Sequence, residues 1–66
     1  MWTQTSGSTF KNADMEIRED WSDDHNYYAW QLWYRNECYG AYSIDEDEAM
    51  RRCEFVRDEQ QTLRGV

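Results

Sequence analysis

The stretch YYAWQLWY at residues 27–34 decides the fold, because five of its eight residues are aromatic. Rings are enriched in β-strands, where they fit the pleated surface. In a strand, alternate residues share a face: Trp30, Leu32 and Tyr34 on one side, and Tyr27, Ala29, Gln31 and Trp33 on the other. Because both faces carry rings, this stretch predicts a central strand or a strand with one partly exposed aromatic face.

The segment before this stretch predicts a second strand. Met15, Ile17 and Trp21 alternate with Glu16, Arg18 and Asp20, and only Glu19 interrupts the pattern. Period-2 alternation is typical of a half-buried strand, so the three apolar side chains are expected to face the core. Residues 22–26 are Ser-Asp-Asp-His-Asn, a cluster that favours a turn between the two strands.

A third strand is expected after the central one. Residues 35–37 read Arg-Asn-Glu and predict a short turn, and residues 38–42 then run back along the sheet. Gly40 lies in the middle of this strand, where a glycine often marks a bulge or a close approach of two backbones.

Residues 43–63 predict the helix of the protein. Ser43 followed by Glu46 fits a capping box, and the acids at 45–48 occupy a first turn in which the helix dipole favours negative charge. The buried stripe at helical spacing is Ala49, Met50, Cys53 and Val56. The helix is expected to end between Gln60 and Leu63, with Gly65 past its end.

The predicted fold class is α+β: a three-stranded antiparallel meander packed against one C-terminal α-helix. All 66 residues belong to a single small domain, which buries only about 60% of the surface that its unfolded chain exposes. Residues 1–12 are polar and small apart from Trp2 and Phe10, and they predict an irregular arm.

Acidic residues dominate the charge of the chain. Fourteen Asp and Glu oppose seven Lys and Arg, which gives a net charge of −7. Six acids fall in residues 14–24 and four are consecutive at 45–48. A solvated surface with a well-capped helix explains part of this pattern. Repulsion among these acidic side chains nevertheless destabilises a small fold. We therefore expect the negative charge to serve in binding a basic partner. Nucleic acid and anionic membranes would repel the chain, and we expect it to bind neither.

The sequence indicates no reaction. His25 is the only histidine, and no second histidine or cysteine lies near it, so a solvated turn residue is favoured over a metal ligand. Cys38 and Cys53 are interpreted as buried small apolar residues, and whether they are bonded stays open. We therefore expect a non-enzymatic protein without cofactor or metal. The chain shows no secretion signal and no membrane span, which favours the cytoplasm.

The segment Tyr42-Ser43-Ile44-Asp45-Glu46-Asp47-Glu48-Ala49 leads from a strand into an acid-capped helix. In a short, acidic and aromatic chain, this junction resembles that of phage-encoded inhibitors, above all the DNA-mimicking anti-CRISPR proteins of type I systems. The resemblance implies that an acidic face docks on the DNA-binding surface of a Cas subunit in the host cytoplasm. An inhibitor of RNA polymerase, an inhibitor of a restriction enzyme and a plain protein–protein adaptor remain as alternatives.

The expected partner-binding residues are nine acids of the two clusters and three aromatic rings. They are Glu16, Glu19, Asp20, Asp23, Asp24, Asp45, Glu46, Asp47 and Glu48, with Tyr27, Tyr28 and Trp33. The stretch 14–24 is the better candidate, because capping already explains part of the acidity at the helix start. The protein is expected to act as a monomer.

Overall fold

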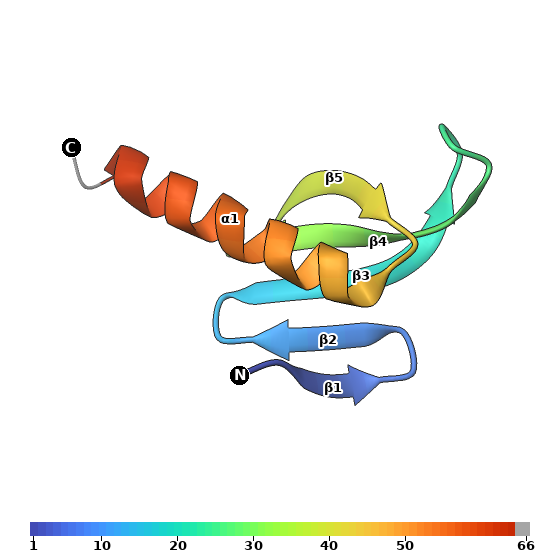
Figure 1. The fold of residues 1–66 in the computed structure, drawn as a ribbon, viewed down its shortest axis with the longest axis horizontal. Helices are drawn as coiled ribbons and strands as arrows, with labels where there is room; N and C mark the ends of the chain where they lie inside the picture. Colours follow the sequence, from blue (N-terminus) through green and yellow to red (C-terminus); the bar gives the residue numbers. More distant parts are fainter. Residues whose placement is uncertain (65–66) are drawn as a thin grey trace.

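The computed structural model describes residues 1–64, and for residues 41, 42 and 64 the backbone alone. Five strands form one antiparallel sheet in chain order, and one helix lies across a face of it (Figure 1). The elements are β1 (Thr3–Ser6), β2 (Thr9–Asn12), β3 (Met15–Ser22), β4 (Tyr27–Tyr34), β5 (Glu37–Ser43) and α1 (Glu46–Arg64). The α+β class is therefore confirmed, with two more strands than the sequence predicted.

The first twelve residues are not an irregular arm, and that prediction is wrong. β1 and β2 form a hairpin, and β2 pairs with β3 so that Phe10 lies opposite Ile17. The Phe10 ring packs edge-on against Trp30, with ring centroids 5.6 Å apart. The indole nitrogen of Trp2 donates to Glu54 of α1 at 3.4 Å. This hairpin satisfies the edge of β3, which would otherwise expose a row of unpaired backbone groups.

The core lies between α1 and the middle of the sheet. Met15, Ile17, Trp30, Leu32 and Tyr34 face the helix, as their alternation predicted. The predicted helix stripe meets them: Ala49 and Cys53 are fully buried, and Met50 and Val56 pack against the cluster from its margin. One compact aromatic and aliphatic layer thus holds the sheet and the helix together.

Strand β5 bends because its pairing with β4 shifts register twice. Gly40 lies at one of the shifts with a φ of 104°, so the predicted bulge is confirmed. The preceding turn is a two-residue one, Arg35-Asn36, with both residues at positive φ, as tight hairpins require. On this strand Cys38 is exposed rather than buried, because it is the register partner of Trp33 on the face that the helix does not cover.

The helix starts two residues later than the capping box predicts. Asp45 is the capping residue, since its Oδ1 accepts from Asp47 N at 3.0 Å and its carbonyl accepts from Ala49 N at 3.0 Å. Ser43 is still part of β5, opposite Trp30, and its hydroxyl accepts from Asp45 N at 2.9 Å. The serine therefore shapes the turn into the helix instead of capping it. Gly65 lies outside the described residues.

Candidate functional site

The two acidic clusters lie at the same end of the molecule. Glu19 pairs with Trp30 across β3 and β4, and Trp30 pairs with Ser43 across β4 and β5. Because α1 begins three residues after Ser43, its acidic first turn lies on the same side of the molecule as the β3–β4 turn, which projects beyond it (Figure 1). We call this region the acidic end; its acids are Glu19, Asp20, Asp23, Asp24, Asp45, Glu46, Asp47 and Glu48.

The acidic end carries the net charge of the whole chain. It holds eight of the fourteen acidic residues, and residues 19–28 and 43–48 include no lysine or arginine. The six other acids are offset by all seven Lys and Arg residues. The negative electrostatic field is therefore concentrated at one end of the molecule. Two acidic patches at opposite ends would divide it.

Two of the predicted site residues lie away from this end. Glu16 accepts from Arg18 Nε at 2.8 Å, and the guanidinium of Arg18 lies 4.2 Å from the centre of the Trp33 ring. Glu16 and Trp33 are also register partners on the sheet face opposite α1. An ion pair neutralises this carboxylate and the arginine covers the ring, so the two belong to a closed cluster on that face.

The aromatic residues of the acidic end gather on the β3–β4 hairpin. Tyr28 is 60% exposed, and Tyr27 and Trp21 are nearly half exposed. The prediction that Trp21 faces the core is wrong, because the hairpin extends past the first turn of α1 and none of the elements described covers it there (Figure 1). Trp21 packs edge-on against its register partner Tyr28 instead, with centroids 5.3 Å apart. Sequence alternation alone gave no signal that this tryptophan is a surface residue.

The tip of the hairpin has a defined shape. Asn26 is at a φ of 62° and donates its backbone NH to the carbonyl of Ser22 at 2.7 Å. The Ser22 hydroxyl lies 2.9 Å from Nδ1 of His25, whose ring is tilted against Tyr27. These bonds hold the turn while Asp23 and Asp24 stay exposed. A preorganised tip loses less conformational entropy when it binds a partner.

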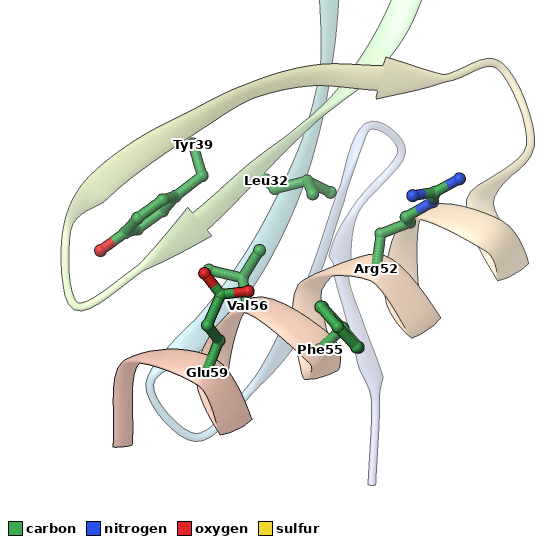
Figure 2. A pocket seen from close by; sticks show the side chains of 6 residues that line it. All are labelled: Leu32, Tyr39, Arg52, Phe55, Val56 and Glu59. Atoms are coloured by element: carbon green, nitrogen blue, oxygen red, sulfur yellow. The ribbon is translucent and has the colours of Figure 1, made fainter. Parts of the chain in front are cut away.

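A concave surface lies between β5 and α1 (Figure 2). Its cleft has a volume of about 250 Å³ and is lined by Leu32, Tyr39, Arg52, Phe55, Val56 and Glu59. Arg52 and Glu59 supply one charge of each sign, and the other four lining residues are apolar or aromatic.

The two cysteines have opposite environments and are not bonded to each other. The thiol of Cys53 is buried and donates to the Trp33 carbonyl at 3.4 Å and weakly to the Glu16 carbonyl at 3.9 Å. Burial raises the pKa of this thiol, which keeps it protonated and unreactive. The interpretation of Cys53 as a buried apolar residue is confirmed, and that of Cys38 is wrong.

The described part of the chain offers neither a metal-binding cluster nor a membrane-spanning helix. Among residues 1–64, no group of three or more His, Cys, Asp or Glu side chains is placed to hold a metal ion. None of the helical structure described is both long enough and apolar enough to cross a membrane.

The chain has no match among family models, curated proteins or solved structures. Its function must therefore be inferred from the surface itself.

Proposed function

We propose that the protein is a non-enzymatic inhibitor that presents its acidic end to a basic, DNA-binding surface of a host protein. A subunit of a type I CRISPR surveillance complex is the favoured target. The observation that supports this is the placement of eight acids at one end of the molecule, in residues 19–28 and 43–48, which include no lysine or arginine. Among these acids, Glu48 pairs with Arg52 further along α1 at 3.9 Å.

The density of charge supports mimicry of a phosphate backbone. Duplex DNA carries about one negative charge per 1.7 Å of its axis. Consecutive acids at the start of α1 advance about 1.5 Å each along the helix axis. The hairpin adds Asp23 and Asp24 on a second element, which widens the charged surface. A basic groove that holds DNA would therefore meet a comparable number of carboxylates.

The aromatic rings of the hairpin supply binding energy that charged side chains alone do not provide. Exposed tyrosine and tryptophan are the side chains that most often dominate binding energy at protein interfaces. Trp21, Tyr27 and Tyr28 lie beside the acids of the same hairpin. The same rings favour a protein–protein adaptor as the second candidate function, in which the aromatic contact and not the charge carries binding.

A DNA-binding assay tests the proposal and separates the candidates. A purified type I surveillance complex, bacterial RNA polymerase and a restriction enzyme are each incubated with the protein, and binding of labelled duplex DNA is then measured. Inhibition of the surveillance complex supports the favoured target, and inhibition of another of the three identifies an alternative target. If none loses DNA binding at a large excess of the protein, the inhibitor proposal is wrong.

Ionic strength distinguishes charge mimicry from an adaptor. Exposed charges are screened beyond about 8–10 Å at physiological salt and over shorter distances at higher salt. An acidic mimic must lose affinity for its target steeply as the salt concentration rises. Affinity that hardly changes with salt would assign binding to the aromatic hairpin instead.

A further inference from the structure

We propose that a second copy of this chain packs antiparallel on the outer face of α1, so that the protein forms a weak two-fold dimer. This outer face is the side of the helix that carries Phe55 and Leu63, which are 68% and 64% exposed. The proposal is independent of the proposed function. It replaces the expected monomer by a concentration-dependent equilibrium.

The outer face of α1 has the pattern of a helix-packing surface. One hollow is bounded by Glu48, Arg51, Arg52 and Phe55, and the next by Phe55, Asp58, Glu59, Thr62 and Leu63. Both sets contain residues i, i+3, i+4 and i+7, which form the holes of knobs-into-holes packing. The holes share Phe55 and follow each other along the helix.

The same face also supplies knobs for those holes. If the two-fold axis passes near residue 57, Phe55 of one copy lies opposite Glu59 of the other, within the second hole. Leu63 then lies opposite Arg51, within the first hole. Each copy donates the same two knobs and the same two holes, as a closed two-fold interface requires. Figure 2 shows Phe55 on the helix between Arg52 and Glu59, so the ring stands at the junction of the two halves.

Charge selects the antiparallel orientation. The first half of the face holds Arg51, Arg52 and Glu48, and the second half holds Asp58 and Glu59. Asp58 is also paired with Arg57 of its own chain at 3.0 Å. In the antiparallel arrangement with its axis near residue 57, the arginines of one copy lie three to five residues along the helix from the acids of the other, about 4.5–7.5 Å, which an arginine side chain can span. A parallel partner places like charges together. Arg52 also pairs with Glu48 of its own chain at 3.9 Å, so its head group is already held over this face.

The antiparallel arrangement also separates the acidic ends. Both begin at the N-terminus of α1, so the two helices carry them at opposite ends of the dimer. The 19 residues of α1 span about 28 Å at about 1.5 Å per residue, which is more than twice the screening length of about 8–10 Å. Mutual repulsion between two acidic ends is therefore small, and a dimer would present both of them to partners.

Analytical ultracentrifugation in reducing buffer tests the dimer directly, with thiols kept reduced so that Cys38 forms no cross-link. A single helix face is a small interface, so the dissociation constant is expected between about 10 µM and 1 mM. The mass should rise with concentration from 8.1 kDa toward twice that value. A mass that stays at the monomer value up to about 1 mM would overturn the proposal.

Substitutions locate the interface. Phe55→Ser and Leu63→Ser should each weaken dimerisation at least about tenfold, since exposed knobs carry most of the contact. Ile44→Ser is the matched control, because Ile44 is 72% exposed but lies before α1, and dimerisation should be unchanged. Circular dichroism confirms that each variant keeps its helix. A dimer that survives Phe55→Ser, or one that Ile44→Ser weakens equally, contradicts the interface.

A charge exchange tests the orientation and does not depend on the apolar variants folding. Arg51→Glu with Arg52→Glu should abolish the homodimer, and so should Asp58→Arg with Glu59→Arg, because each makes all four facing groups alike. Mixing the two double variants should restore dimerisation, now as a heterodimer. If the arginine variant dimerises as well as the original chain, the antiparallel arrangement is wrong.

Discussion

The acidic end and the middle of the sheet differ in net charge and in the burial of their side chains. At the acidic end eight acids meet without a lysine or arginine, and the rings of the hairpin are exposed. In the middle of the sheet, Ile17 and Leu32 are completely buried under Cys53 of α1, and the charges of the remaining residues nearly balance. Stability and net charge are therefore separated in space, which leaves one end free to carry a field that would destabilise the core.

The helix start and the hairpin differ in how far local structure explains their acids. Asp45 caps α1, and Glu46, Asp47 and Glu48 occupy its first turn, where each carboxylate stabilises the helix by about 0.3–1 kcal/mol. Glu19, Asp23 and Asp24 lie on a hairpin without a helix dipole to stabilise them. Aspartate favours a turn at positions 23 and 24, but the three carboxylates make no hydrogen bond or ion pair within the described part of the chain. The hairpin is therefore the more informative half of the acidic end.

Truncating the core should have the largest effect. Leu32→Ala leaves a cavity under α1 and should lower the free energy of unfolding by about 2–5 kcal/mol. Ile44→Ala, at an exposed position beside the acidic end, should change it by less than about 0.5 kcal/mol. Urea denaturation measures both. Equal effects of the two substitutions would show that stability is not confined to the middle of the sheet.

The two thiols offer a second probe of the difference between exposed surface and buried core. At mildly alkaline pH, Cys38 should react with a thiol reagent at least about 100 times faster than Cys53, which must wait for local opening. Burial raises the pKa of Cys53, so the folded state disfavours its thiolate. The resulting stability is present below the pKa of the unfolded thiol and is lost as the pH rises toward that of the folded one.

A Cys53→Ala variant should therefore lose less stability than the original chain between neutral and strongly alkaline pH. Thiol labelling followed by mass spectrometry gives the reaction rates, and denaturation at several pH values gives the stability. Comparable labelling rates for the two cysteines would contradict the buried position of Cys53.

Removing one hydroxyl should stabilise the core. Tyr34 is buried, and its OH finds no hydrogen-bond partner among the described residues. An unsatisfied buried polar group costs about 1–3 kcal/mol, so Tyr34→Phe should raise the free energy of unfolding by about 1 kcal/mol. Thermal denaturation measures the change. A loss of stability would show that the hydroxyl has a partner.

The smallest expected change in stability comes from glycine substitutions in the turns at the two ends of the sheet. Ala13 has a φ of 53° in the turn that is remote from the acidic end, and Asn26 has a φ of 62° at the hairpin tip. A left-handed conformation is unfavourable for alanine and tolerated by asparagine. Ala13→Gly should therefore stabilise the protein by about 0.5–1 kcal/mol, and Asn26→Gly by clearly less. An equal gain at both positions would refute this explanation.

The sequence predicts the parts of the fold whose side chains meet the core. Alternation in residues 15–18 and 30–34 identifies two strands correctly, the run that follows the turn at 35–37 identifies a third, and the stripe from Ala49 to Val56 identifies the helix. The β1–β2 hairpin was missed because Thr3–Ser6 is exposed throughout and has no apolar alternation. Gly7, between two serines, was the available turn signal.

The errors at the candidate site have a common physical origin. Trp21 and Cys38 were assigned to the core from sequence, but the hairpin extends past the helix, and Cys38 lies on the sheet face that α1 leaves open. One-dimensional alternation does not reveal how far a covering layer extends. Nor does it reveal that Glu19 and Ser43 lie at the same end of the sheet. Both are paired with Trp30 of β4, which is distant from each of them in the chain.

Charge reversal at the two ends tests the central claim most directly. Asp23→Lys with Asp24→Lys changes the acidic end. Asp14→Lys with Glu37→Lys changes an exposed turn residue and the exposed first residue of β5 at the opposite end. Each pair raises the net charge by four units, from −7 to −3. Inhibition of DNA binding by the surveillance complex is then measured for both. We predict a loss of at least about tenfold in potency for the first pair, about 1.4 kcal/mol, and less than about threefold for the second. Equal losses for the two pairs would contradict the account.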